Sequence, residues 1–166
     1  MGAYARAQVV DNIKYESRQV KLFFVKNMGE DTYKKNEGDS ICNPKLSPIE
    51  ITIKTFPDFM ITETLRNLFA ARNETLAKIS ESEVLLNPLK KSGLVVGWVK
   101  VPKYNHVVNL QGKISYANDC ELQAIKSQIV TTLGQFDAGA EIWLNGSAQN
   151  FTCLGLSPAK CKINTS

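Results

Sequence analysis

The stretch from Leu94 to Gly146 constrains the fold more than any other part of the chain. Two β-rich runs, LVVGWVKV and YNHVVNL, stand on either side of a short turn that begins at Lys103. Runs so close together predict a β-hairpin. An amphipathic helix and a last strand, AEIWLNG, follow directly.

The helix in this stretch carries its own start signal. Asn118 and Glu121 stand three residues apart, an asparagine version of the capping box that satisfies free amide groups at a helix start. The apolar positions after it keep helical spacing and form one stripe: Leu122, Ile125, Ile129, Leu133 and Phe136. In the last strand, Ala140, Ile142 and Leu144 alternate with Glu141 and Trp143.

The N-terminal half predicts two further strands and a helix. RQVKLFFVK, from Arg18, is one strand, and IEITIKTF is a second with its isoleucines on a single face. A polar loop carrying Cys42 joins them over residues 27–47. After Pro57, Asp58 is placed to cap a helix whose apolar positions run from Ile61 to Ile79.

The predicted order is therefore β, β, α, β, β, α, β. It indicates an α+β two-layer sandwich, in which two helices pack on one face of a mixed or antiparallel sheet. We expect residues 1–17 to be a lead-in or linker, 18–146 to be the domain, and 147–166 to be an otherwise unstructured C-terminal tail.

Cys42, Cys120, Cys153 and Cys161 permit two disulfides in any of three connectivities. Cys153 and Cys161 bracket the short loop LGLSPAK, where a bridge would restrain a segment with little core burial of its own. Four reduced thiols are the alternative, and we expect oxidation. The cysteine spacing and the single histidine do not suit a zinc site, so we expect no metal.

The order of elements resembles the GerMN domain, a family named for bacterial sporulation and spore-germination proteins. The matching pieces are VKLFFV, TETLRNLFAA, WVKVPKYNHVVNL, SQIVTTLGQF and EIWLNG, which together span Arg18 to Gly146. Two features depart from the family: Asn109 stands where an acidic residue is common, and the loop over residues 27–47 is long. The tail after Gly146 has no counterpart.

This resemblance implies a fold similar to ring-building motifs and a secreted or membrane-anchored bacterial domain. Such a domain binds a protein partner, or copies of itself, at the cell envelope and catalyses nothing. The start MGAYARAQ has no hydrophobic segment typical of a signal peptide, so we expect the export segment to be absent from this sequence.

The composition argues against several other classes of protein. The net charge is +4 and the lysines are spread along the chain, so we expect no nucleic-acid partner. No apolar run is long enough for a membrane-spanning helix. Gly-rich phosphate loops, HExxH and GxSxG are all missing, so we expect no cofactor.

Trp143 is the candidate centre of an interaction surface. If Ile142 and Leu144 face the helices, Trp143 faces the other side of the sheet, together with Phe23 and Val25. Exposed aromatic residues on a sheet face suit contact with a protein or a glycan. The alternative is that the long loop or the tail covers these residues.

Two other functions remain open. In a carbohydrate or peptidoglycan binding module, Trp143 or Trp98 would stack on sugar rings. In a small thiol enzyme, Cys120 at a helix start would be the nucleophile and His106 its base, but no orienting acid or oxyanion motif is evident. We expect Cys120 to be a disulfide partner and His106 to be structural.

Overall fold

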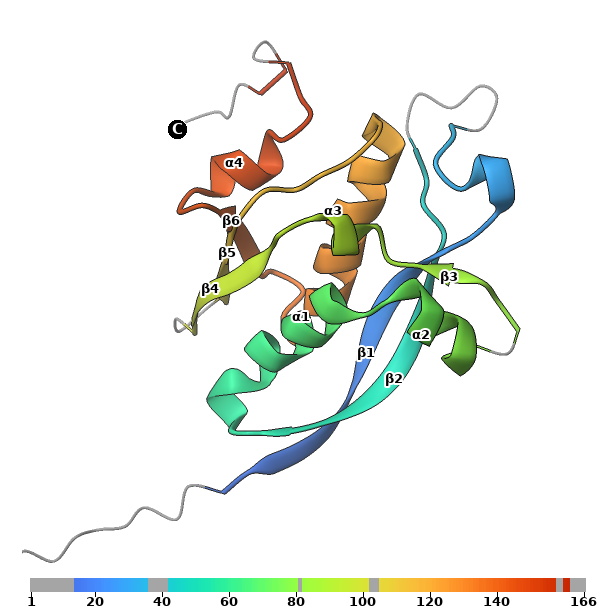
Figure 1. Cartoon of the computed structure of the whole chain (residues 1–166). Coiled ribbons are helices and arrows are strands. Elements are labelled where there is room, and N and C mark those ends of the chain that lie inside the picture. Colours follow the sequence, from blue (N-terminus) through green and yellow to red (C-terminus); the bar gives the residue numbers. More distant parts are fainter. Residues whose placement is uncertain (1–13, 36–41, 81, 102–104, 158–159, 162–166) are drawn as a thin grey trace, which may run out of the picture.

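The computed structural model describes residues 14–35, 42–80, 82–101, 105–157 and 160–161 (Figure 1). The strands are β1 (Glu16–Lys26), β2 (Leu46–Thr55), β3 (Leu85–Leu86), β4 (Val95–Lys100), β5 (Val107–Gln111) and β6 (Glu141–Leu144). The α-helices are α1 (Met60–Ala70), α2 (Asn73–Ile79), α3 (Asp119–Gly134) and α4 (Ala148–Thr152). Short 3-10 turns lie at Gly29–Asp31, Pro57–Phe59 and Pro88–Lys91. The predicted α+β class is confirmed.

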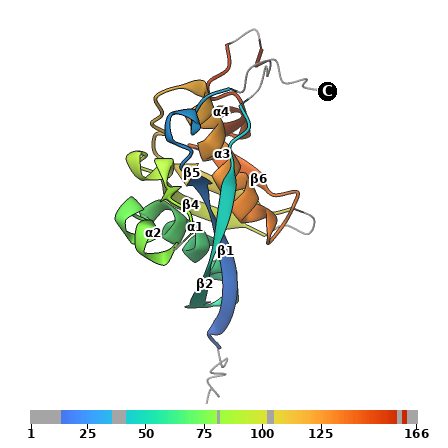
Figure 2. The same ribbon diagram turned by 90° about the vertical axis from the view of Figure 1, so that its right-hand side faces the viewer.

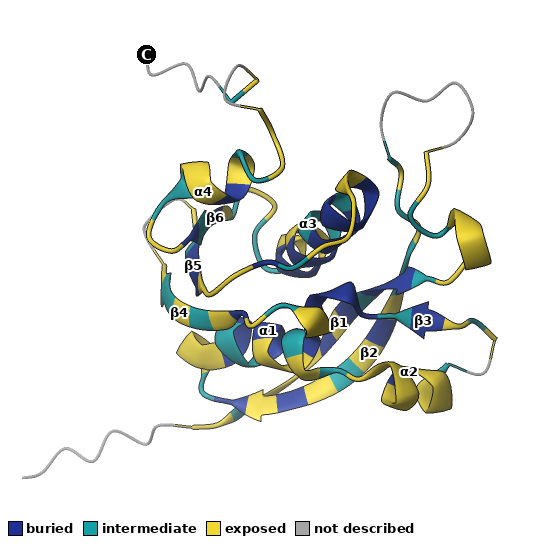
Figure 3. Ribbon diagram, turned by 45° about the horizontal axis from the view of Figure 1, so that its top comes forward, coloured by how far each residue is buried: buried dark blue, intermediate teal, exposed yellow. Residues whose placement is uncertain are grey.

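The strands form two three-stranded sheets, where we expected one. The first has the order β2-β1-β3 and is antiparallel throughout. The second has the order β4-β5-β6, and its β4–β5 pair is the predicted hairpin, while β5 and β6 run parallel. Figures 1 and 3 show α1 and α3 between the two sheets, and Figure 2 shows α1 and α2 on the same side of β1 and β2.

The sheets remain separate because α3 occupies the edge of β1. The side-chain amide of Gln135 accepts from Lys21 N at 2.8 Å and donates to Lys21 O at 2.7 Å. One repeat further along β1, Thr132 Oγ1 accepts from Phe23 N and Gln128 Nε2 donates to Phe23 O. Next to these bonds, β3 takes over the edge at the C-terminal end of β1. A row of polar side chains on one helix thus replaces a neighbouring strand.

One core joins the inner faces of both sheets to α1 and α3. Burial alternates along β1, since Val20, Leu22 and Phe24 are buried while Gln19 and Lys21 are exposed (Figure 3). The predicted stripe of α3 is also confirmed, and its buried members are Leu122, Ile125, Ile129 and Leu133. Burial of this apolar surface is the main stabilising contribution.

The predicted capping box is present at the start of α3. Asn118 Oδ1 accepts a hydrogen bond from Glu121 N at 2.9 Å. The Glu121 carboxylate reaches back to accept from Ala117 N at 2.6 Å, and Lys91 Nζ lies 3.4 Å from it. Glu121 is 2% exposed, so these partners compensate for the burial of its charge.

The single helix expected between Asp58 and Ile79 is two helices, and Asp58 does not cap either of them. Asp58 lies in a 3-10 turn, and α1 ends where Ala71 adopts an extended backbone. Asn87 is buried and donates to Leu68 O at 2.7 Å and to Ala71 O at 3.1 Å. The break occurs because this side chain satisfies carbonyl groups that the helix leaves free at its end.

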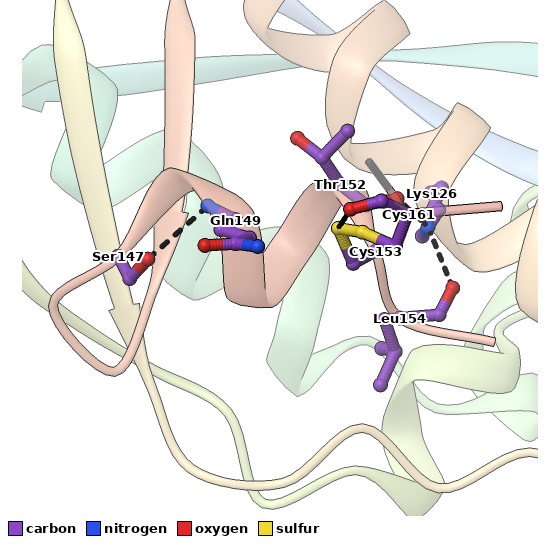
Figure 4. Close-up of a disulfide and its surroundings, with 7 residues drawn as sticks. All are labelled: Lys126, Ser147, Gln149, Thr152, Cys153, Leu154 and Cys161. Carbon is purple, nitrogen blue, oxygen red and sulfur yellow. Dashed lines mark hydrogen bonds between the residues drawn. A yellow bond between two sulfur atoms is a disulfide. The ribbon is translucent and has the colours of Figure 1, made fainter. Parts of the chain in front are cut away.

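The segment expected to be an unstructured tail contains α4. Ser147 caps this helix by accepting from Gln149 N, and Phe151 is 7% exposed within the core. Lys126 of α3 donates to Thr152 O at 3.1 Å and to Leu154 O at 2.9 Å, which fixes the end of α4 on α3 (Figure 4). Partial burial lowers the pKa of Lys126. The tail is ordered here because one aromatic side chain enters the core.

Candidate interaction surface

A β-bulge at Gly97 decides which face of the second sheet carries Trp98. Val96 pairs with Leu110 and Trp98 pairs with Asn109, so β4 has one more residue than β5 between these pairs. Val96 therefore packs against the core while Trp98 turns to the outer face. A Cβ at Gly97 would come within 2.9 Å of the Gln111 side chain, so glycine suits this position.

The outer face of this sheet holds a cross-strand row of Trp98, Asn109 and Trp143. Asn109 pairs with Trp98 in β4 and with Trp143 in β6. The two indole rings are 5.6 Å apart between centroids and inclined at 70°, an edge-to-face arrangement. Asn109, which lies between them, is only 2% exposed and accepts from Gly146 N at 2.8 Å. The tryptophans thus shield a buried amide that anchors the end of β6.

Charged groups flank the two rings. Lys100 Nζ lies 4.8 Å from the Trp98 ring centroid, within range of a cation–π interaction. Glu141 Oε1 accepts a hydrogen bond from Trp143 Nε1 at 2.5 Å. Trp98 and Trp143 are both partly exposed, and Lys100 and Glu141 are exposed. We call Trp98, Lys100, Glu141 and Trp143 the tryptophan face.

The expected grouping of Trp143 with Phe23 and Val25 is wrong. Phe23 and Val25 belong to β1 in the first sheet, whereas Trp143 belongs to β6 in the second. Val25 is 0% exposed, so it cannot lie on a contact surface. Phe23 is partly exposed, and its backbone is bonded to α3. The partner of Trp143 is instead Trp98, and the signal for it in the sequence is Gly97.

The structure pairs the four cysteines in two disulfides, one of the three connectivities that the sequence permits. Cys42 is bonded to Cys120 with a Cα–Cα distance of 5.2 Å, and Cys153 to Cys161 with 5.3 Å. Both distances are ordinary for disulfides. The first bridge fastens the loop between β1 and β2 to the start of α3, and the second closes the loop after α4 (Figure 4).

The first bridge places the sulfur of Cys120 in a disulfide, where it cannot act as the thiolate that a thiol enzyme needs. His106 instead pairs with Asp137, whose Oδ2 lies 3.0 Å from His106 Nδ1 and accepts from His106 N at 2.7 Å. Gly139 N donates to Oδ1 of the same carboxylate. The hydrogen bonds from the His106 backbone and ring lower the pKa of Asp137 to about 2. His106 therefore connects the start of β5 to the turn after α3.

In the described part of the chain, no three His, Cys, Asp or Glu side chains come close enough together to hold a metal ion. Nor does any described helix combine the length and apolarity needed to cross a membrane.

Comparison with known proteins assigns no family. No family model and no curated protein matches the chain. Among solved structures, a crystal structure described as "Putative Lipoprotein from Clostridium perfringens" is similar over 82% of this chain and 79% of that chain. The two share 13% sequence identity, and the TM-score is 0.39. A similarity at this level establishes neither family nor function.

Proposed function

We propose that this chain is a non-catalytic interaction domain that works outside the cytoplasm, as its resemblance to GerMN domains implies. The observation that carries the proposal is the edge-to-face pair of Trp98 and Trp143 on the outer side of a sheet whose inner side forms the core. The domain binds a protein partner of the cell envelope through the tryptophan face.

The disulfides support a location in an oxidising compartment. Both bridges hold irregular segments, the long loop after β1 and the segment after α4, to the body of the domain. Bridges of this kind persist in secreted and envelope proteins and are rare where glutathione and thioredoxin keep thiols reduced.

The composition of the tryptophan face supports a protein partner. Tryptophan is enriched among the residues that dominate binding energy at protein interfaces, and its large rings lose little conformational entropy on binding. Lys100 and Glu141 place opposite charges beside the rings, which gives a partner both an apolar contact and a fixed orientation.

A carbohydrate such as peptidoglycan is the second candidate ligand. Partly exposed indole rings beside a carboxylate and an ammonium group can contact the apolar face of a sugar and bond its hydroxyls. The two kinds of ligand can be distinguished by whether a cross-linker placed on the tryptophan face forms an adduct with a protein or with peptidoglycan.

The test is photo-cross-linking in the organism that makes the protein. A photoreactive phenylalanine replaces Trp143, and the matched control carries it at the exposed Thr131 of α3. We expect one protein adduct from position 143 and none from 131. An adduct to peptidoglycan would favour the second candidate, and equal labelling from both positions would overturn the proposal.

A further inference from the structure

The two long strands of the first sheet differ in how their outer edges are protected. The outer edge of β1 is closed by side chains of α3 and by β3. The outer edge of β2 has no neighbouring strand in the described part of the chain, since β2 ends the order β2-β1-β3 (Figure 1). An edge of this length is a template for pairing with another strand.

The bonds of β1 fix which backbone groups of β2 point toward the open edge. The backbone of Lys21 points at α3, because both of its groups bond Gln135. Lys21 lies opposite Glu50, so this is a non-hydrogen-bonded pair of the β1–β2 ladder. Glu50 therefore directs its N–H and C=O outward, and by the alternation of a strand so do Thr52 and Lys54.

Pro48 limits the free edge. Pro48 lies two residues before Glu50, so its backbone faces the same open edge. Proline has no N–H, so it cannot donate a hydrogen bond to a neighbouring strand. After the end of β2 at Thr55, only Phe56 precedes a second proline, Pro57. Within β2, the donors available after Pro48 are therefore the N–H groups of Glu50, Thr52 and Lys54.

The charges on this edge match only one two-fold register. A second copy running antiparallel, with Thr52 opposite Thr52 of the other copy, places Glu50 opposite Lys54 at both ends. The outward backbone groups of all three residues then meet in hydrogen-bonded pairs. Registers centred on Glu50 or on Lys54 instead place like charges opposite each other, which is destabilising.

The exposed face of the sheet extends the same charge pattern. Lys21 Nζ lies 3.8 Å from Glu50 Oε1 on the exposed face, where both side chains are more than half exposed. In the paired sheet, Glu50 lies between Lys21 of its own copy and Lys54 of the other. On the opposite face, Ile51 of one copy comes opposite Ile53 of the other. The edge is thus self-complementary in charge and in apolar character.

We propose that two copies of this chain associate through antiparallel pairing of their β2 edges, centred on Thr52, to join the two three-stranded sheets. This inference goes beyond the proposed function and uses a surface on a different sheet from the tryptophan face. Two-fold pairing of this kind is isologous, so it closes as a dimer and does not extend into a filament.

The test is sedimentation velocity of purified protein over a series of concentrations, with charge variants of β2. Glu50→Lys and Lys54→Glu each place like charges opposite each other in the homodimer. We expect each to weaken dimerisation roughly tenfold or more, given about 0.2 to 1 kcal/mol for each cross-strand pair and two pairs whose sign reverses. An equimolar mixture of the two variants restores opposite charges at both positions, so we expect a heterodimer.

The double variant E50K/K54E restores complementarity within one chain and is expected to dimerise like the wild type. Lys113→Glu, at an exposed position after β5 of the second sheet, makes the same charge change on another part of the fold and is expected to leave the dimer unchanged. Thr52→Pro removes the central donor but no β1–β2 hydrogen bond, and it is expected to give a folded monomer. Circular dichroism is the check that each variant is folded.

A wild-type protein that is monomeric at every concentration would overturn the inference. So would single variants that dimerise normally, or a mixture that does not recover. None of these results bears on partner binding at the tryptophan face, where adduct formation from position 143 is the separate readout.

Discussion

The side-chain amide of Gln135 makes with Lys21 the same two hydrogen bonds that a residue of a neighbouring strand would make. It accepts from Lys21 N at 2.8 Å and donates to Lys21 O at 2.7 Å. An exposed residue at the end of a helix thereby closes a strand edge that would otherwise be open to pairing with another chain.

Replacement of Gln135 by alanine is expected to lower the free energy of unfolding by about 1 to 2 kcal/mol. The N–H and C=O groups of Lys21 lose their hydrogen-bond partner in this variant and bond water instead. Urea unfolding followed by circular dichroism measures the change. Gln149→Ala, at an exposed position of α4, is the matched control and is expected to have little effect. Equal stability of the Gln135 variant and wild type would show that the contact contributes nothing net.

Stability is expected to depend on Asp137 in acid. The folded-state pKa is about 2, below the ordinary value of 3.8, because His106 and Gly139 donate hydrogen bonds to the ionised carboxylate. A depressed folded pKa contributes stability above the unfolded value, and this contribution is lost as pH falls from about 4 to about 2.

The Asp137→Asn variant lacks this ionisation. Its unfolding midpoint in urea should therefore lie below that of the wild type at pH 6, and the difference should shrink as the pH approaches 2. A constant difference across the acid range would contradict the assignment.

The two disulfides are expected to contribute unequally. The Cys42–Cys120 bridge closes a sequence separation of 78 residues and the Cys153–Cys161 bridge one of 8. Loop-closure entropy gives about 4.5 kcal/mol for the first and about 2.5 kcal/mol for the second. Paired Cys→Ser variants, compared by thermal unfolding, should show the larger loss for Cys42 and Cys120. The reverse order would mean that the second bridge holds Phe151 and α4 in the core more strongly than its loop length indicates.

Asn109 is expected to be structural although it lies under the tryptophan face. Asn109→Ala removes the acceptor for Gly146 N and should destabilise the fold by about 0.5 to 1.5 kcal/mol, since the turn after β6 loses a hydrogen bond. Gln111→Ala, on an exposed position of the same strand, is the control. A variant of Asn109 as stable as the control would mean that water replaces the lost acceptor.

The elements that sequence analysis predicted best are those with local signals. Three such features are formed by residues of a single strand or helix: the isoleucine alternation of β2, the stripe of α3 and the capping box of Asn118 and Glu121. Side-chain spacing alone dictates such features, because an apolar stripe must be buried wherever it occurs. The hairpin of β4 and β5 belongs to the same class.

The features that were missed depend on contacts between distant residues. Nothing near Lys21 shows that Gln135 will close the edge of β1 and keep the two sheets apart. The bulge at Gly97 reverses the face of Trp98, so strict alternation through β4 places that ring on the wrong side. Val25 shares the alternation of an exposed strand face but is buried. Phe151 likewise lies in a polar tail whose composition does not reveal the pocket it fills.

The decisive measurement is intact mass after thiol alkylation of protein isolated from the organism that makes it, with and without prior reduction. An interaction domain that works outside the cytoplasm, fastened by both disulfides, has no free thiol. We therefore expect no alkylation of Cys42, Cys120, Cys153 or Cys161 until the protein is reduced, and alkylation of all four afterwards. Alkylation of all four in folded protein without reduction would contradict that claim and return Cys120 to consideration as a reactive thiol.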